Sequence, residues 1–268
     1  MKIILTGITG NLGNEVAKTF MREGFTVIPI VRSKNIFHHL SDIHTDSIIA
    51  NDLINDEEVV FSQNVDCIIH CAGVVRFKDS MGANQKMMSK ILRLAEKLQI
   101  PLYHMSTAFL YRHKDRLGFN NEYEKDKWAA EQMFIASGIS GAIFRPSILT
   151  GNSKSGIIQN FSGYYLVAQA FLSTIKDSMA KDYKIRFPRL LGQTNIIPAD
   201  QAAQAIYNAV RAARSGVLYV TNPNPPRFFW LLQETLDFFG LGEKVNFLDC
   251  SFDDFGKLEL TDMEQKLF

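Results

Sequence analysis

The chain has 268 residues, of which 46% are hydrophobic and 21% charged, and its 29 basic and 28 acidic residues give a formal net charge of +1. This length can bury one large core, or a core with a small appendage. The near-neutral balance, without a dense basic run, argues against broad electrostatic capture of nucleic acid, so we expect no nucleic-acid partner.

The first residues of the chain and its cysteines indicate the cellular compartment in which the protein is expected. Residues 1–5 lead directly into Thr6-Gly7, which leaves no room for the hydrophobic region of a signal peptide. No apolar run reaches the roughly 18 residues that a membrane span needs, so we expect no membrane span. The three cysteines contain no CxxC pair, and this low, odd number is typical of a reducing compartment. We therefore expect a cytoplasmic globular protein.

Strand-like and helix-like segments alternate through the first half of the chain. We expect strands at 2–5, 25–31, 47–50, 65–70, 101–106 and 141–148, and helices at 11–23, 83–98 and 122–136. Apolar strands separated by helices indicate a parallel sheet covered on both faces. Right-handed crossovers then predict an α/β fold with a doubly wound parallel (Rossmann) sheet. Pro29 falls inside the second strand and lacks a ladder donor, so we expect a bulge or an unpaired group there.

The pattern changes after Gly151. Residues 151–195 are rich in Gly, Ser, Phe and Tyr, and beyond them we expect helices at 198–214 and 227–239 and strands at 218–220 and 245–248. We predict a dinucleotide-binding core at 1–150. We expect residues 151–268 to be a mixed segment, in which a small C-terminal substrate lobe is joined by elements that return to the core.

A glycine-rich loop lies between the first strand and the first helix. Gly7 permits a tight turn, Gly10 lets the backbone approach a pyrophosphate, and Gly13 allows close packing of helix on strand. The helix N-terminus then points free N–H groups at the anion. The loop predicts a dinucleotide site, whose remaining members are Thr9, Asn11 and Leu12.

The end of the second strand bears on the cofactor. An NAD site normally has an acidic residue there, about 20 residues beyond the loop, but this strand ends in Val31-Arg32-Ser33. Because a guanidinium can bind a 2′-phosphate, NADP(H) is favoured, and NAD(H) is the alternative if Arg32 is only a solvated charge. Asp52, followed by Leu53, is a candidate for the adenine amino group; the alternative is a loop carboxylate without a ligand.

Tyr123 and Lys127 are spaced i, i+4, so on a helix they share a face. A buried lysine beside the phenol is expected to draw its pKa from about 10 toward neutrality, which suits a general acid for carbonyl reduction. Upstream, Ser106 and Thr107 end the fifth strand, where ligands of a doubly wound sheet bind. We expect the Thr107 hydroxyl to contact the reacting oxygen; strand-end capping is the alternative.

Together these residues resemble the extended short-chain dehydrogenase/reductase superfamily, which includes NAD-dependent epimerases and dehydratases. The resemblance is carried by TGITGNLG at 6–13, NDL at 51–53, HCAG at 70–73, HMST at 104–107, the Tyr123/Lys127 pair and Arg145-Pro146-Ser147. A narrower resemblance is to the thioester reductase and fatty acyl-CoA reductase (male sterility) branch. Its motifs are GVVRF at 73–77, YEKDKWAAE at 123–131, RPSILTGNSKSG at 145–156 and NIIPAD at 195–200.

The resemblance implies roles for individual residues. Tyr123 is similar to the proton donor, Lys127 to the residue that holds the nicotinamide ribose, and Thr107 to the hydroxyl of an oxyanion contact. The residues implied beside the cofactor are Cys71, Ala72 and Gly73 of the HCAG motif, and Pro146 and Ser147, which are similar to the strand-end turn beside the nicotinamide. The chain departs from the branch at Asp126, where a Ser often precedes the lysine, and at Asn51, which replaces a Gly.

The branch uses NADPH to reduce a thioester-bound acyl group, so the leading hypothesis is an NADPH-dependent reductase of a carbonyl or acyl thioester. A nucleotide-sugar epimerase with tightly bound NAD and a non-catalytic NADP sensor are the alternatives. The dehydratase variant is disfavoured because Ala108-Phe109 stand where an Asp-Glu pair is needed.

The expected partner is a small-molecule or carrier-bound acyl substrate. A pocket lined by Phe161, Tyr164, Tyr165 and Phe171 could receive an apolar group, and a cluster of Lys181, Lys184, Arg186 and Arg189 could meet the phosphates of pantetheine or CoA. The alternatives are lobe packing and a solvated face. We expect no metal site, because strand alternation separates Cys67, His70 and Cys71. A homodimer through 83–98 and 123–136 is compatible with Met88 and Leu92.

Overall fold

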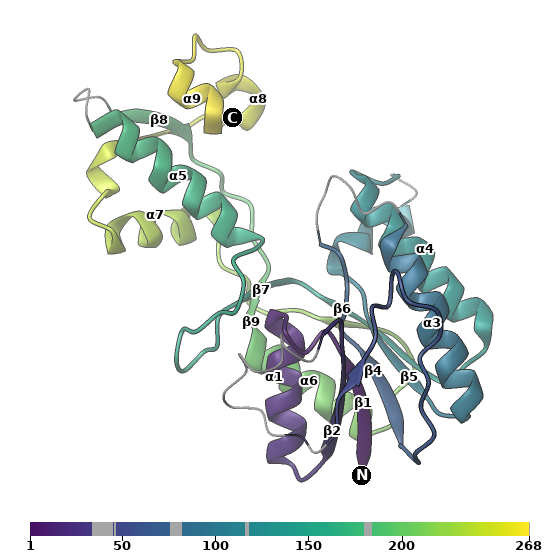
Figure 1. Ribbon diagram of the computed structural model, residues 1–268. Helices are drawn as coiled ribbons and strands as arrows, with labels where there is room; N and C mark the ends of the chain where they lie inside the picture. Colours follow the sequence, from purple (N-terminus) through teal and green to yellow (C-terminus); the bar gives the residue numbers. More distant parts are fainter. Residues whose placement is uncertain (34–44, 46, 76–81, 116–117, 180–183, 268) are drawn as a thin grey trace. The chain divides into compact units, whose positions relative to one another are not determined.

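The computed structural model describes residues 1–33, 45, 47–75, 82–115, 118–179 and 184–267 (Figure 1). Internal contacts divide the chain into two compact units. Unit 1 comprises Met1–Asn160 and Ile197–Thr221, and unit 2 comprises Phe161–Ile196 and Asn222–Phe268. The chain therefore leaves unit 1 after Asn160 and returns to it once before it ends in unit 2.

Unit 1 contains a seven-stranded sheet in the order β10-β6-β5-β4-β1-β2-β3, and every neighbouring pair is parallel. The strands are β1 (Lys2–Thr6), β2 (Thr26–Val31), β3 (Ile49–Ala50), β4 (Cys67–His70), β5 (Leu102–Met105), β6 (Gly141–Pro146) and β10 (Gly216–Val220). The chain runs outward from β1 to β3 and then crosses to β4 on the other side of β1, which confirms the doubly wound α/β sheet. Ligands of such sheets bind at this reversal, beyond the carboxyl ends of the strands.

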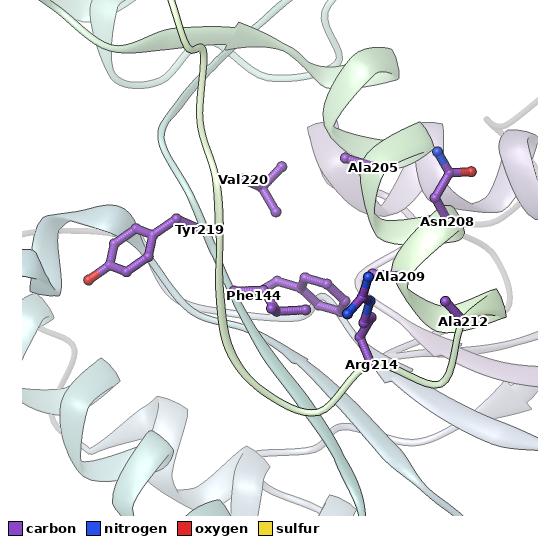
Figure 2. Close-up of a pocket in the computed structure, with 9 residues that line it drawn as sticks. Phe144, Ala205, Asn208, Ala209, Ala212, Arg214, Tyr219 and Val220 are labelled. Atoms are coloured by element: carbon purple, nitrogen blue, oxygen red, sulfur yellow. The ribbon is translucent and has the colours of Figure 1, made fainter.

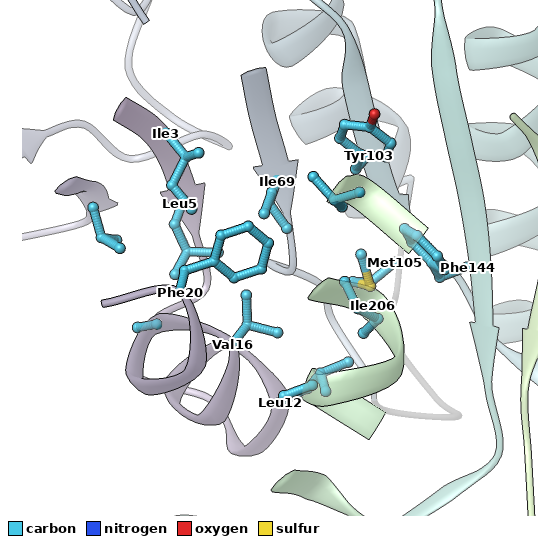
Figure 3. Packing of buried hydrophobic residues seen from close by; sticks show 14 of the residues in the cluster. Ile3, Leu5, Leu12, Val16, Phe20, Ile69, Tyr103, Met105, Phe144 and Ile206 are labelled. Carbon is cyan, nitrogen blue, oxygen red and sulfur yellow. The ribbon is translucent and has the colours of Figure 1, made fainter. Parts of the chain in front are cut away.

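Helices cover both faces of the sheet (Figure 1). α1 (Asn11–Arg22) packs with α6 (Ala199–Arg211) on one face, and α3 (Ala83–Leu98) packs with α4 (Glu122–Ser137) on the other. Alternation along β1 supplies both cores, because Ile3 and Leu5 join the cluster of α1 and α6 while Ile4 joins the cluster of α3 and α4. Figure 3 shows Phe20 of α1 among Leu5, Val16 and Ile69 in the first cluster. In the part of the chain that the structure describes, no helix is long and apolar enough to cross a membrane.

Two strands differ from the sequence predictions. The bulge expected at Pro29 is wrong: the ladder with β1 runs through Leu5 and Pro29 without interruption. β3 pairs only with Ile30 and Val31, so at Pro29 the strand has a neighbour on one side only. The sixth strand ends at Pro146, which has no N–H for a ladder. β7 (Ile148–Thr150) instead pairs with β9 (Ile196–Pro198).

Unit 2 packs α5 (Tyr164–Met179) and α7 (Phe228–Phe238) against a parallel pair, β8 (Ile185–Pro188) and β11 (Val245–Leu248). The short elements η2 (Gly242–Lys244), α8 (Phe252–Phe255) and α9 (Asp262–Leu267) complete it. The sequence analysis named no element within 151–195 and so missed α5, which contains neither Gly nor Pro and which most of the Gly and Ser residues of this segment precede.

Packing within unit 2 uses several residues that were candidates for a substrate pocket. Phe171 is 2% exposed and lies edge-on to Phe187, with ring centroids 4.7 Å apart. Tyr164 donates its hydroxyl to the Leu231 carbonyl at 3.0 Å, whereas Phe161 is 68% exposed. The packing alternative therefore describes Phe171 and Tyr164 better than a pocket lining.

The described members of the basic cluster lie beside carboxylates. Arg186 donates to both oxygens of Glu264, at 2.8 and 2.7 Å. An oxygen of Asp249 lies 2.8 Å from Arg189, and one of Glu243 lies 4.0 Å from Lys184. Lys181 falls outside the described residues. Lys184, Arg186 and Arg189 therefore each have a carboxylate of the chain nearby.

The surface expected at a dimer interface is partly used inside unit 1. Met88 is fully buried in the cluster of α3 and α4, so its proposed contact with a second copy is wrong. Leu92 packs against the same cluster and is only partly buried. The homodimer itself stays a prediction.

Candidate active site

The glycine-rich loop joins β1 to α1 at the reversal of the sheet. Gly7 has a φ of +74°, and a Cβ there would lie 2.5 Å from the backbone nitrogen of Ala72. A Cβ on Gly13 would overlap the Gly7 carbonyl oxygen. Gly10 precedes α1 and donates its N–H to that carbonyl at 2.9 Å, and among the described residues no side chain caps this helix. The loop is therefore a tight backbone turn that leaves the helix N-terminus available to an anion.

A hydrogen-bonded cluster links this loop to the HCAG segment. The Thr6 hydroxyl lies 2.7 Å from Nδ1 of His70 and accepts the N–H of Ala72 at 3.0 Å. Cys71 donates its N–H to the Thr6 carbonyl at 3.2 Å. Burial raises the pKa of the Cys71 thiol to about 12, so the thiol is neutral. The structure thus brings three predicted residues, Cys71, Ala72 and Gly73, beside the glycine loop.

Two loop residues, Thr9 and Asn11, hold a segment that the sequence analysis did not connect to the site. The Asn11 side chain donates to the carbonyl of Asn160 at 2.7 Å and accepts its N–H at 2.7 Å. The Asn160 amide also donates to the Thr9 carbonyl, at 3.3 Å. Leu12, by contrast, packs its side chain into the core. Asn160 lies 149 residues from Asn11, so no local pattern could have indicated the contact.

Tyr123 and Lys127 lie at the start of α4, which Asn121 caps by accepting the N–H of Glu124. The side chains of Tyr123 and Thr107 are hydrogen-bonded to each other. The ammonium of Lys127 donates to the carbonyl of Met105 at 3.1 Å, and it would lie 2.7 Å from a Cβ on Gly73. Gly7 meets Ala72 and Gly73 meets Lys127, so the glycine loop and the Tyr–Lys pair belong to one continuous site.

Burial controls the charges of this pair. Desolvation lowers the pKa of Lys127 to about 8, against the opposing effect of Asp126, Cys71 and Glu131. Desolvation raises the pKa of Tyr123 to about 12, although the hydrogen bond with Thr107 lowers it. The expectation of a phenol acidified by the lysine is therefore wrong for the residues of this site by themselves. At neutral pH the pair is a neutral phenol beside an ammonium.

The predicted adenine end of the site is more exposed. Arg32 follows β2 at the surface. The carboxylate of Asp52 accepts the N–H of Ile54 at 2.9 Å and the side-chain amide of Asn55 at 2.9 Å. These bonds lower the pKa of Asp52, and the charge of Arg32 lowers it further, so the two side chains share one environment. Leu53 is buried in the core.

Pro146 ends β6 and Ser147 follows it, at the same edge of the sheet. Ser147 donates its N–H to the carbonyl of Val220 at 3.1 Å. Its hydroxyl is buried and has no hydrogen-bond partner among the described residues, and the same holds for the hydroxyl of Ser106 after β5. Buried unpaired hydroxyls are costly, and at a strand edge they are suited to a polar ligand.

A buried ion pair behind the site was not recognised from the sequence. Arg145 donates to both carboxylate oxygens of Glu131, at 3.0 and 2.6 Å, and to the Tyr219 hydroxyl at 2.8 Å. Glu131 is spaced i, i+4 from Lys127, so it shares the inner face of α4. The helical spacing of YEKDKWAAE could have indicated that Glu131 lies on the same face of the helix as Lys127.

The site fits a dinucleotide on two observations. A Cβ would collide with backbone at Gly7 and with the Lys127 side chain at Gly73, and the buried hydroxyls of Ser106 and Ser147 have no hydrogen-bond partner among the described residues. A pocket of about 340 Å³ lies elsewhere, between β10 and α6 (Figure 2), and contains none of the predicted site residues. It is lined by Phe144, Ala205, Asn208, Ala209, Ala212, Arg214, Leu218, Tyr219 and Val220. Within the described residues no group of three His, Cys, Asp or Glu side chains could hold a metal.

Comparison with known families finds one match that covers more than half of the chain. The family described as male sterility protein, a family of NAD-binding domains, matches residues 50–206. The matched range includes the HCAG segment, Thr107, Tyr123, Lys127 and Pro146-Ser147. A comparison with curated proteins finds no match.

Solved structures share the fold at low sequence identity. The UDP-N-acetylglucosamine 4-epimerase from Bacillus cereus is 18% identical with a TM-score of 0.65, covering 100% of this chain and 94% of its own. The Bordetella bronchiseptica enzyme WbmH in complex with NAD+ is 17% identical with a TM-score of 0.67, covering 99% and 95%. The reductase domain of the aureusimine biosynthetic cluster is 17% identical with a TM-score of 0.72, covering 99% and 78%.

Proposed function

The chain belongs to the male sterility protein family, and from that premise we propose that it reduces a carbonyl or acyl-thioester group with NADPH. It is an NAD(P)-dependent enzyme of the extended short-chain dehydrogenase/reductase type. The choice of a reductase rests mainly on one observation: the Tyr123 phenol is buried, hydrogen-bonded with Thr107 and protonated at neutral pH. A protonated phenol is the form that gives a proton to a carbonyl oxygen during reduction.

The residues of the site divide the work. We assign the pyrophosphate to the Gly7–Gly13 loop and the N-terminus of α1, and the nicotinamide ribose to Lys127 beside Gly73. When bound, NADPH supplies the hydride. Thr107 orients the substrate oxygen toward Tyr123, and the phenol gives its proton to that oxygen. The ammonium of Lys127 stabilises the phenolate that remains.

The preference for NADPH over NADH rests on the end of β2. Arg32 is exposed there and Ser33 follows, so neither of these residues presents a carboxylate to a ribose 2′-hydroxyl. A guanidinium can donate two hydrogen bonds to a 2′-phosphate. The nearest predicted acid, Asp52, already accepts hydrogen bonds within its own turn.

For the substrate we propose a small-molecule or carrier-bound acyl group. The motifs 73–77, 123–131 and 145–156 are similar to those of thioester reductases, and the fold resembles the aureusimine cluster's reductase domain. The test is stopped-flow loss of NADPH absorbance with acyl-CoA, acyl-pantetheine and small aldehydes. Turnover on at least one of these is expected. Binding of NADPH without turnover on any carbonyl would overturn the proposal.

The alternative function is that of an epimerase. It is suggested by the similarity to UDP-sugar 4-epimerases, but at 18% and 14% sequence identity this similarity shows the fold alone. Epimerisation begins with an oxidation, for which the tyrosine must accept a proton, and a pKa of about 12 leaves little phenolate at neutral pH. Tightly retained NAD in the purified protein would favour the epimerase. Unchanged binding of a partner protein by Tyr123→Phe, with no activity in the parent, would favour the sensor.

A further inference from the structure

Two carboxylates flank Lys127 on α4, and they are neutralised differently. Glu131 forms the bidentate ion pair with Arg145, so its charge is balanced directly. Asp126 is 3% exposed and accepts hydrogen bonds from neutral groups: the Asn84 N–H at 2.9 Å, the Asn84 amide at 2.8 Å and the Gln85 amide at 3.0 Å. Among the described residues Asp126 has no ion pair. Hydrogen bonds from neutral groups stabilise such a buried carboxylate but do not cancel its negative charge, which still acts on neighbouring groups.

The hydrogen bonds of Asp126 lead to the backbone that faces Lys127. Its partner Asn84 accepts the N–H of Val74 at 3.0 Å and donates to the Val74 carbonyl at 3.2 Å. A Cβ on the preceding residue, Gly73, would lie 3.2 Å from the Asn84 amide oxygen and 2.7 Å from the Lys127 nitrogen. Asp126, Asn84, Gly73 and Lys127 therefore form one connected cluster across α3, α4 and the end of β4.

Resting on the proposed function, we propose that Asp126 is a positioning residue of the reductase site. Through Asn84 it fixes the backbone at Gly73–Val74, and its negative charge keeps Lys127 an ammonium in a buried position. It contacts neither substrate nor cofactor in this role. Related sequences often have a serine at this position, before the lysine. A serine would form a hydrogen bond but would not carry the negative charge that Asp126 places near Lys127.

The other groups around Lys127 contribute little net charge. His70 and His104 face it from β4 and β5, and burial lowers the pKa of His70 to about 3 and that of His104 well below its usual value, so both are neutral. The Cys71 thiol is neutral, and Glu131 is paired. Of the groups that raise the pKa of Lys127 toward its value of about 8, the charge of Asp126 has the largest effect.

The test is the titration of Lys127 in the protein without added substrate, which does not depend on turnover. The Cε signal of Lys127 in 13C-lysine-labelled protein, assigned with Lys127→Met, is followed by NMR from pH 6 to 11. Asp126→Asn should lower the pKa of Lys127 by about 1 unit, because an opposite charge nearby is lost. Glu122→Gln is the matched control, since it removes a charge from the exposed face of the same helix and should leave the titration unchanged.

Asp126→Ser is the second variant, because a serine hydroxyl can still accept the Asn84 N–H if the asparagine variant folds poorly. In either variant the basic limb of the pH profile of kcat/KM should move down with the Lys127 titration, which a purely structural defect would not cause. An unchanged titration in a folded variant overturns the proposal. If the titration shifts but the protein turns over no carbonyl, the positioning role of Asp126 is supported and the proposed reductase function is overturned.

Discussion

The two halves of the site are built on different physical principles. The glycine loop works by the absence of side chains: its contacts are backbone approaches at Gly7 and Gly13 that a single added Cβ would block. The Tyr–Lys half works by side chains whose charges depend on burial, with Tyr123 held neutral and Lys127 held near its titration. We therefore expect substitutions and pH to separate them. The loop should respond to steric changes and the Tyr–Lys half to changes in charge.

The largest expected effect is on the Tyr–Lys half. Tyr123→Phe removes the proton donor but keeps the ring that packs in the buried site. We expect kcat to fall by about 10²- to 10⁴-fold, the usual contribution of a general acid, while the Kd of NADPH stays close to that of the parent. Tyr207→Phe is the control, because that hydroxyl lies at the surface near Glu23. Retention of full activity by Tyr123→Phe would show that another group gives the proton.

The second effect tests the loop. Gly7→Ala should raise the Kd of NADPH by about 100-fold, because the new Cβ would collide with Ala72 and displace the backbone that binds the cofactor. Gly24→Ala is a matched control: Gly24 also has a positive φ, +81°, but a Cβ there meets nothing within 4 Å. Both variants should share a backbone cost of about 1–2 kcal/mol in the free energy of unfolding. Fluorescence titration then isolates the steric part, and equal Kd values for the two variants would refute the role of close approach.

The same contrast explains which parts of the molecule the sequence could predict. Residues 83–98 have apolar positions at helical spacing on a single face, and the structure places α3 at Ala83–Leu98. In α5, by contrast, Phe171 and Ile175 are buried while Leu166 and Val167 are 51% and 38% exposed, so no single apolar face marks the helix. The spacing of apolar residues predicted a helix well where the opposite face is polar, as in α3, and poorly in α5, where apolar residues also lie on the exposed face.

In the site, too, local patterns could be predicted from the sequence and long-range contacts could not. The spacing of Tyr123 and Lys127 and the glycine triplet are local, and both could be predicted. The contacts of Asp126 with Asn84 and of Asn160 with Asn11 join residues 42 and 149 positions apart, and only the folded chain brings them together. The charge of Tyr123 could not be predicted either, because the desolvation that sets its pKa depends on everything packed around it.

The third effect concerns the adenine end of the site, away from the Tyr–Lys half, where substitution of Arg32 shows whether a side-chain charge contributes to cofactor binding. If its guanidinium binds the 2′-phosphate, Arg32→Ala should raise the Kd of NADPH by about 10- to 30-fold and leave that of NADH unchanged. Lys97→Ala, which removes the same charge from the exposed end of α3, should change neither value. Equal losses for the two cofactors would mean that Arg32 acts through Asp52 or through folding, and not by selecting the phosphate.

The smallest effect, and the sharpest separation, should come from pH alone. Lys127 has a pKa of about 8 and is needed as a cation, so kcat/KM should be level below pH 7 and fall as the pH rises through 8. One unit above that pKa, at pH 9, the loss should be about tenfold. Over pH 7–9 the Kd of NADPH should change by less than about twofold, because the glycine loop binds through backbone N–H groups that do not titrate and a neutral Lys127 amine still has N–H groups to donate to the ribose. Both quantities are measured across this range. A parallel fall in affinity would mean that the positive charge of Lys127 is needed to bind the cofactor, whereas a level kcat/KM up to pH 10 would mean that the ammonium is not required for the reaction.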